Sequence, residues 1–354
     1  MENTWWLAPC APLQTGIAEQ AAQRQAELTK PLGALGRLEQ VAIQCAAWQG
    51  QVQPSITQPH AVLFAADHGV VAQGVSAFPQ AVTVEMLKNF VHGGAAMSVL
   101  TQHHGMPLTL VNCGTAIPCE QVTGVLHRPI ALGTADFSQQ PAMTTEQAQQ
   151  ALALGAEQAE HAHQQGCDLL LVGEMGIGNT SCATVLAAAL LQQPVAELVG
   201  AGTGLAGAAL AHKCEVLTRS VERADIGPEH DALNIAEQLG GFEVLAMTGA
   251  YLRAAQLGLP SLVDGFIASA ALLLAQRFQP RVTDWVLYGH QSAEPGHQAV
   301  LAALNAQPLV SLGMRLGEGS GAAIAYPLVQ QALLLHRAMA TFAEAAVSSS
   351  ASEG

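Results

Sequence analysis

The chain contains 354 residues, half of them hydrophobic, with 13 Lys and Arg against 27 Asp and Glu. A chain of this length can bury a large core without disulfides or structural metals. The formal net charge of −14 would repel a phosphate backbone, so nucleic acid is excluded as an expected partner. An anionic ligand would need local help from backbone N–H groups and a well-placed Lys or Arg.

The seven cysteines are scattered and form no C-x-x-C pair, which is typical of thiols in a reducing compartment. The N-terminal segment from Met1 to Trp6 lacks the basic start and apolar run of a signal peptide. The longest apolar run, from Phe266 to Ala275, is too short to span a bilayer. We therefore expect a soluble, cytoplasmic protein that does not bind membranes.

Hydrophobic patterning predicts an α/β fold. The first fifty or so residues have apolar side chains at helical spacing. Short apolar runs then predict strands at 61–66, 108–111, 168–172, 285–288 and 309–312. Helices are predicted at 82–102, 145–164, 180–192, 205–219, 242–257 and 265–277, and from beyond residue 318 to about 346. Strands this apolar indicate a parallel sheet covered by helices on both faces. We assign residues 59–324 to a large catalytic domain, and 1–58 plus 325–354 to a smaller helical one.

Two glycine-rich segments follow strand-like or loop regions and precede helices. The first spans 172–181, and the second spans 199–205, with Lys213 two helical turns further on. Glycines let the backbone approach an anion closely, and a helix N-terminus supplies free N–H groups. Neither segment is a Walker A loop or a complete G-x-G-x-x-G, so a monophosphate is favoured over a dinucleotide. Tight turns without a ligand, and a solvated Lys213, remain open alternatives.

A third glycine-rich segment, 313–321, places Glu318 between two glycines near the start of a helix. A carboxylate in that position is sterically open and could act as a base, although a helix-capping role is the alternative. Glu174 occupies an analogous position on the first glycine segment. The two carboxylates could form an acid/base or charge-stabilising pair.

Histidines are plentiful, but their spacings do not predict a metal site. None forms H-E-x-x-H or another pattern that places ligands on one helical face. His161 and His163 lie in a polar helical stretch, whereas Asp67-His68 and His290 follow strands and could line a site. We expect no metal and no other cofactor.

Several segments together resemble the nicotinate-nucleotide:dimethylbenzimidazole phosphoribosyltransferases of cobalamin biosynthesis. They occur in order along most of the chain, at 30–39, 66–70, 173–180, 240–243, 247–249, 262–266, 292–294 and 314–321. The resemblance implies a Rossmann-like sheet, a small helical domain from both termini and a homodimer. It also implies transfer of the phosphoribosyl group of nicotinate mononucleotide to 5,6-dimethylbenzimidazole, giving α-ribazole 5′-phosphate and nicotinate.

The resemblance also implies roles for individual residues. Glu318 corresponds to the general base, and Glu174 is the second catalytic candidate. Positions associated with the nucleotide are Glu174, Gly176, Asn179, Thr180, Gly202, Thr203, Gly204, Leu205 and Lys213. Walls for the planar base are expected from Phe78, Met86, Met175 and Leu316. The chain departs from the family at Asn112, where an aspartate is expected, and at Phe78 and Met86, where some members have Ser and Gln.

The chemistry agrees with these residue types. Nicotinate mononucleotide already carries a pyridinium nitrogen, so its departure needs no general acid, and one carboxylate suffices to deprotonate the attacking benzimidazole. An NAD(P)-dependent oxidoreductase is a rival interpretation, but the complete dinucleotide fingerprint is absent. A non-catalytic nucleotide-binding protein with the same fold is the other alternative.

Overall fold

The computed structural model describes residues 4–227 and 229–348, which form two compact units. The larger unit contains residues 4–10 and 58–324, and the smaller one contains 11–57 and 325–348. No helix in this described part of the chain combines the length and apolar character of a membrane span.

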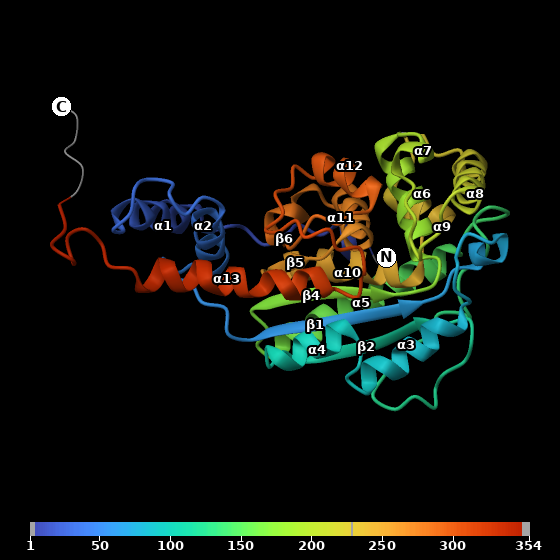
Figure 1. Cartoon of the computed structure of the whole chain (residues 1–354), viewed down its shortest axis with the longest axis horizontal. Helices are drawn as coiled ribbons and strands as arrows, with labels where there is room; N and C mark the ends of the chain where they lie inside the picture. The colour runs from blue at the N-terminus through green and yellow to red at the C-terminus, as the bar shows by residue number, and fades with distance from the viewer. Residues whose placement is uncertain (1–3, 228, 349–354) are drawn as a thin grey trace. The chain divides into compact units, whose positions relative to one another are not determined.

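The larger unit is built on one parallel sheet with strand order β3-β2-β1-β4-β5-β6 (Figure 1). The strands are β1 (Pro59–Ala66), β2 (Leu108–Gly114), β3 (Leu126–His127), β4 (Leu169–Met175), β5 (Ser261–Val263) and β6 (Val286–Tyr288). Every residue of β1 is buried, as expected for a strand covered on both faces. The predicted Rossmann-like parallel sheet is confirmed.

Helices and short 3-10 turns connect these strands. They are η1 (Trp5–Leu7), η2 (Gly69–Gln73), α3 (Ala81–Val91), α4 (Ala96–His103), α5 (Thr145–Gln164), α6 (Asn179–Leu191), α7 (Val195–Leu198), α8 (Ala208–Ala224), α9 (Ala232–Leu239), α10 (Phe242–Leu257), α11 (Phe266–Phe278), η3 (Pro280–Trp285) and α12 (Pro295–Ala303). Helices α3 and α4 lie on one face of the sheet, and α5 and α10 lie on the other (Figure 1). The connections between parallel strands are right-handed, and the strand order runs in opposite directions from the centre of the sheet. The connecting helices on the two sides therefore lie on opposite faces.

The smaller unit contains α1 (Thr15–Glu27), α2 (Arg37–Gln49) and the end of α13 (Ser320–Ala338), which begins in the larger unit. Gln25 Nε2 lies 2.8 Å from His336 Nδ1, and Arg24 Nε donates to the carbonyl oxygen of His336 at 2.9 Å. Segments from the two ends of the chain are therefore joined by buried polar contacts as well as apolar packing.

The compact units differ from the predicted domains at the N-terminus. Residues 4–10 belong to the larger unit, although the sequence pattern assigned 1–58 to the smaller one. The ring of Trp6 packs edge-on against Phe278 at 6.5 Å, and Gln256 Nε2 donates to the carbonyl oxygen of Trp5 at 2.9 Å. These partners are far away in the sequence, so local periodicity could not reveal them.

Three predicted elements also differ from the structure. The helix expected at 82–102 is divided into α3 and α4, because Gly93 adopts a left-handed φ of 79°. The final helix ends at Ala338 rather than near residue 346. The strand expected at 309–312 is only an isolated bridge between Val310 and His290. The second strand from the end of the sheet, β5, was missed because only two of its residues, Leu262 and Val263, form an apolar run, whereas the run at 285–288 predicted β6.

The contact between α5 and α10 depends on glycines on both helices. A Cβ at Gly155 would overlap the carbonyl oxygen of Ala246, and one at Gly249 would overlap that of Leu152. Because α10 also packs on β1 and β4, this close approach helps to fix the layer beneath the centre of the sheet.

We expect Gly155→Ala to destabilise the protein by about 1–3 kcal/mol, because the helices must separate to admit the methyl group. The matched control is Gly16→Ala on α1, where an added Cβ meets no atom within 4 Å. The control should be neutral or slightly stabilising, since alanine favours the helix. Thermal unfolding of both variants checks the prediction, and equal Tm values would contradict it.

Candidate active site

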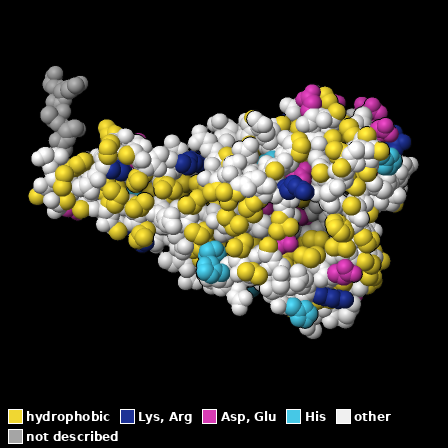
Figure 2. All heavy atoms as spheres, viewed as in Figure 1, with side chains coloured by type: hydrophobic (Ala, Val, Ile, Leu, Met, Phe, Trp, Pro, Cys, Tyr) yellow, Lys and Arg dark blue, Asp and Glu magenta, His cyan; other side chains and the backbone are white. Residues whose placement is uncertain are grey.

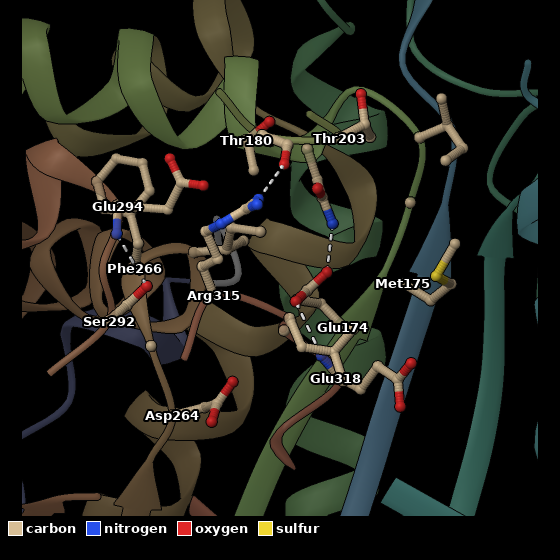
Figure 3. Close-up of a pocket in the computed structure, with 18 of the residues that line it drawn as sticks. Glu174, Met175, Thr180, Thr203, Asp264, Phe266, Ser292, Glu294, Arg315 and Glu318 are labelled. Carbon is tan, nitrogen blue, oxygen red and sulfur yellow. Dashed lines mark hydrogen bonds between the residues drawn. The ribbon is translucent and has the colours of Figure 1, made fainter. Parts of the chain in front are cut away.

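A cavity of about 330 Å³ opens in the larger unit at the carboxyl ends of β1 and β4. These neighbouring strands lead into connections that cross to opposite sides, so they form the topological switch point where ligands bind in open α/β sheets. The surface here is hollowed, with acidic side chains among hydrophobic ones (Figure 2). Figure 3 shows Glu174 and Glu318 close together, with Arg315 drawn between Glu174 and the more distant Glu294.

The first glycine segment forms the turn from β4 into α6. A Cβ at Gly176 would overlap the carbonyl oxygen of Ala66, so only glycine lets the turn lie directly on the end of β1. Gly178 has a left-handed φ of 103° and precedes Asn179, the first residue of α6. The N-terminus of α6 therefore faces the cavity, where its free N–H groups favour an anion.

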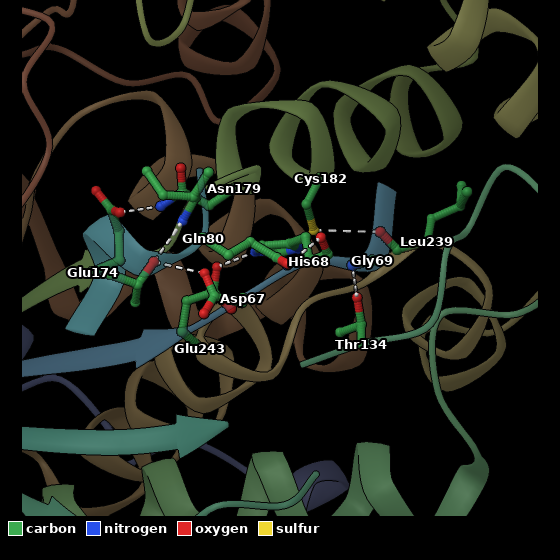
Figure 4. Close-up of polar contacts among 12 residues, drawn as sticks. Asp67, His68, Gly69, Gln80, Thr134, Glu174, Asn179, Cys182, Leu239 and Glu243 are labelled. Atoms are coloured by element: carbon green, nitrogen blue, oxygen red, sulfur yellow. Dashed lines mark hydrogen bonds and ion pairs between the residues drawn. The ribbon is translucent and has the colours of Figure 1, made fainter. Parts of the chain in front are cut away.

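A buried hydrogen bond between His68 and Glu243 supports this turn from below. His68 Nε2 lies 2.6 Å from Glu243 Oε1, and both side chains are fully buried (Figure 4). A Cβ at Gly176 would come within 3.2 Å of Glu243 Oε1. His68, which the sequence analysis considered as a possible lining residue, thus lies beneath the turn rather than on the cavity wall.

Gly173 brings the two candidate catalytic carboxylates together. It lies on β4 immediately before Glu174, and the carbonyl oxygen of Glu318 occupies the place where its Cβ would be. The backbone N–H of Glu318 donates to Glu174 Oε1 at 3.2 Å, and Asn179 Nδ2 donates to Glu174 Oε2. Glu174 and Glu318, which are 144 positions apart in the chain, are joined by these direct contacts.

Burial dominates the electrostatics of Glu174. Its side chain is enclosed, and loss of hydration raises its pKa to about 8, with Asp264 and Glu243 adding to the effect. The N–H of Glu318 opposes the rise because it stabilises the ionised form. Glu174 in the protein alone is therefore protonated at neutral pH, and a cation entering the cavity would favour its ionisation.

The backbone of Glu318 adopts an unusual conformation. Its φ is 66°, between Gly317 at 88° and Gly319 at 85°, so a non-glycine residue is held in the left-handed region. Glu318 Oε2 accepts a hydrogen bond from Met97 N at 3.1 Å, in the first turn of α4. Burial raises the pKa of Glu318, while the N–H groups of Met97 and Ala96 lower it. The side chain therefore reaches α4 instead of capping the helix that follows it in sequence.

The second glycine segment lies beside a buried lysine. Lys213 on α8 is 1% exposed, and its Nζ donates to the carbonyl oxygen of Gly200 at 3.2 Å and to Thr180 Oγ1 at 3.3 Å. Burial lowers the pKa of Lys213 to about 8, and the nearby carboxylate of Glu294 opposes this change. A Cβ at Gly202 would lie 3.0 Å from Nζ, so glycine is needed there. The ammonium group is thus available to an anion.

The structure gathers most of the predicted site residues around the cavity. Its lining includes Glu318, Glu174, Gly176, Asn179, Thr180, Gly202, Thr203, Phe78, Met86, Met175 and Leu316. Lys213 lies behind Thr180 and Gly202, next to the lining. Gly204 and Leu205 do not line the cavity, and Gly204 is exposed.

Sequence reasoning missed several lining residues. They are Val82, Ile177, Asp264, Gly265, Phe266, Ile267, Ser292, Glu294, Arg315 and Gly317. Asp264 follows β5, so recognition of that short strand would have found it. His290, considered as a lining residue from its position after a strand, does line the cavity and lies 3.5 Å from Asp264. The unexpected Asn112 is buried away from it and accepts hydrogen bonds from Gly114 N and Thr115 N.

The histidines form no evident metal centre. No group of three or more His, Cys, Asp or Glu side chains arranged to hold a metal ion occurs within residues 4–227 and 229–348. His161 is exposed and hydrogen-bonds to Gln165, four residues further along the chain. His163 is also exposed.

A parallel sheet that gathers two glycine loops, a buried lysine and paired carboxylates around one cavity is typical of α/β proteins that bind ligands at the carboxyl ends of their strands. A family model described as "Phosphoribosyltransferase" matches residues 10–347. The chain belongs to this phosphoribosyltransferase family.

Its relatives carry a more specific name. Nicotinate-nucleotide–dimethylbenzimidazole phosphoribosyltransferase of Pseudomonas aeruginosa (strain UCBPP-PA14) is 53% identical over 348 residues, which cover 98% of this chain and 99% of that protein. The protein of the same name from Azotobacter vinelandii (strain DJ) is 53% identical over 350 residues, with the same coverage of both chains.

Solved structures agree with these relationships. A crystal structure of the phosphoribosyltransferase of that name from Thermus thermophilus superposes with a TM-score of 0.89 and 42% identity, covering 95% of this chain and 99% of that one. A crystal structure of CobT from the same organism gives a TM-score of 0.91 and 43% identity, covering 95% and 100%. The family model matches residues of both units.

The raised pKa of Glu174 predicts a pH dependence of stability. Between pH 4.5, the ordinary pKa of Glu, and about pH 8, the folded protein keeps a proton that the unfolded chain releases. The contribution of Glu174 is complete below pH 4.5 and is lost as the pH rises through about 8. Glu174→Gln removes this term, so its Tm relative to the wild type should increase between pH 5 and about 8.

Calorimetry of both proteins across that range checks the prediction. The matched control is Glu120→Gln, since Glu120 is exposed and lies outside the cavity. Its Tm should follow that of the wild type at every pH. Parallel curves for the wild type and Glu174→Gln would contradict the assigned protonation of Glu174.

Proposed function

We propose that the protein transfers the phosphoribosyl group of nicotinate mononucleotide to 5,6-dimethylbenzimidazole, forming α-ribazole 5′-phosphate and nicotinate. The observation that carries this proposal is the joined pair Glu174 and Glu318, which lines one cavity together with residues of both glycine segments, next to Lys213. Relatives named for this reaction match nearly the whole chain. This similarity favours these two substrates over those of an oxidoreductase, and it favours catalysis over nucleotide binding alone.

The phosphate would lie near the N-terminus of α6 and the second glycine segment. Lys213 is the buried cation of this region, and the N–H group of Thr180 lies in the first turn of the helix. These groups provide the local positive potential that the net charge of −14 does not. A fixed phosphate holds the ribose so that C1′ faces the acceptor.

Glu318 would act as the general base. One benzimidazole nitrogen attacks C1′, the C1′–pyridinium bond breaks, and nicotinate leaves with the bonding electron pair. The second benzimidazole nitrogen gives its proton to the Glu318 carboxylate. Attack opposite the leaving group inverts C1′ and yields the α-riboside. The raised pKa of Glu318 makes its carboxylate a stronger base than an exposed glutamate.

Glu174 would stabilise positive charge. The pyridinium of the bound nucleotide and the oxocarbenium-like ribose both favour an ionised carboxylate nearby, which opposes the rise in its pKa caused by burial. Both oxygens of Glu174 accept hydrogen bonds, so its position is fixed before the substrates bind. It therefore differs in role from Glu318, whose oxygen accepts from the start of α4.

The acceptor base would stack between apolar side chains on the other side of the cavity. Met86, Met175, Phe78 and Leu316 provide these walls. Phe78 and Leu316 are 51% and 59% exposed in the single chain, which supports a homodimer whose second copy helps to close the site. We further propose that the dimer works in the cytoplasm and needs neither a metal nor another cofactor; sedimentation of the purified protein tests the dimer.

The function is tested by a product assay. Wild-type protein given nicotinate mononucleotide should release nicotinate only when a benzimidazole is present, with matching formation of the α-riboside phosphate. Glu318→Gln should bind both substrates but lose about 10²–10⁴-fold in kcat, because Gln cannot accept the proton. An acceptor that enters already deprotonated should restore the turnover of Glu318→Gln and not that of Glu174→Gln. Near wild-type turnover by Glu318→Gln would reject the base assignment.

Lys213→Ala should chiefly weaken nucleotide binding. Loss of a direct charged hydrogen bond to the phosphate should cost about 1.5–3 kcal/mol, so KM for nicotinate mononucleotide should rise by roughly ten- to a hundredfold. Lys213→Met keeps the apolar part of the side chain and should raise KM as Lys213→Ala does. Lys88→Ala is the control, because Lys88 is exposed. Steady-state kinetics at varied concentrations of nicotinate mononucleotide measures this KM. An unchanged KM would show that Lys213 does not bind the phosphate.

A further inference from the structure

One buried hydroxyl group joins two walls of the cavity. Thr83 lies on α3 between Val82 and Met86, which line the cavity, and is itself completely buried. Its Oγ1 donates to Asp67 Oδ1 at 2.6 Å and accepts from the backbone N–H of Ile177 at 3.1 Å. Ile177 is the central residue of the turn from β4 into α6. The hydroxyl thus connects the wall of α3 directly to the glycine turn.

Asp67 provides a fixed anchor for this hydroxyl. Its carboxylate is 0% exposed, and Oδ2 accepts from Ala116 N at 2.8 Å. Its backbone N–H donates to Gly114 O at 3.0 Å, and its carbonyl oxygen accepts from Thr134 N at 3.0 Å. Figure 4 shows Asp67 where β1 ends, beside His68. Every polar atom of Asp67 therefore has a hydrogen-bond partner, which fixes the side chain at the end of the sheet.

A second hydrogen bond ties α3 to the same place. Gln80, which precedes the first turn of α3, donates through Nε2 to the carbonyl oxygen of His68 at 3.0 Å. The glycine turn also packs against the end of β1. Gly176 lies against the carbonyl oxygen of Ala66, and Gly178 lies against the side chain of His68. The end of β1 therefore serves as a common base for both walls.

We propose that Thr83, held by Asp67, is a positioning residue for the transfer: it sets the separation between the acceptor wall on α3 and the glycine turn. This inference rests on the proposed function, in which one wall holds the planar base and the other holds the nucleotide. The attacking nitrogen and C1′ belong to substrates bound on these two walls. Their separation therefore depends on the hydroxyl bridge, although Thr83 contacts neither substrate.

Replacing the hydroxyl with a methyl group isolates this role. Thr83→Val keeps the volume but leaves the Asp67 carboxylate and the Ile177 N–H without their shared partner. The turn and α3 can then move apart. A misplacement near 1 Å can cost about a hundredfold in rate, so we expect kcat/KM to fall by about 10- to 100-fold. Thr83→Ser keeps the hydroxyl and should retain kinetics close to those of the wild type.

The experiment measures kcat, KM for each substrate and Tm for the full-length variants. The matched control is Thr248→Val on α10, where an equally buried hydroxyl donates to Val244 O at 2.9 Å and Ala271 O at 3.0 Å. Thr248 does not line the cavity, so its variant should lose Tm without losing kcat/KM. Loss of kcat/KM in Thr83→Val, with rescue in Thr83→Ser, supports a positioning role.

The inference is overturned if Thr83→Val has a lower Tm and wild-type kinetics, or if Thr248→Val loses kcat/KM to the same extent. If Thr83→Val does not fold, Asp67→Asn tests the inference instead, because it weakens the hydrogen bonds that hold Thr83 by changing one atom of Asp67. Unchanged kinetics in Asp67→Asn would also overturn the inference. A wild-type protein that forms no α-riboside phosphate would instead reject the proposed function. The two failures are therefore distinguishable.

Discussion

The arrangement of the site depends on the absence of a side chain at Gly173. The backbone of Glu318 lies in the space that any Cβ on this residue of β4 would fill. Because Glu174 is the next residue of the strand, this single contact places the two carboxylates side by side and lets the N–H of Glu318 bond to Glu174. Gly317 and Gly319 allow the chain to make this approach while Glu318 itself remains in a left-handed conformation.

The same close packing concentrates acidic groups in a place where their charged forms are costly. Glu174, Glu318, Asp264 and Glu294 line one cavity, and burial raises the pKa of each of them. Proton uptake relieves their mutual repulsion. A ligand that combines an anionic phosphate with a cationic ring would match both the glycine loops and the carboxylates, which is the charge pattern of nicotinate mononucleotide.

Rigid support comes from layers that do not contact the ligand. The glycines that bring α5 against α10 allow α10 to hold Glu243 beneath the turn after β4. On the other face, α3 is tied through Thr83 and Gln80 to the end of β1. The glycine turn therefore rests on fixed elements, even though its own backbone has the conformational freedom of glycine.

The sequence by itself predicted the parallel sheet, because 61–66 and 169–172 are continuous apolar runs, and it predicted α5 and α10 at their observed bounds. It also singled out Glu174, Glu318 and both glycine segments, since residues with special chemistry after strands stand out locally. Their roles came from the resemblance to a family and from the chemistry, and they stay proposals.

Only the tertiary structure decided which of these residues meet. The contact of Gly173 with Glu318, the side chain of Glu318 at α4, and the bridge from Thr83 to Ile177 all join segments far apart in the chain. Asp264 was missed because its strand has only two consecutive apolar residues, and residues 4–10 group with the larger unit because Trp6 packs on Phe278. Periodicity records which face of an element is buried, but the partner on that face is chosen by packing across the whole fold.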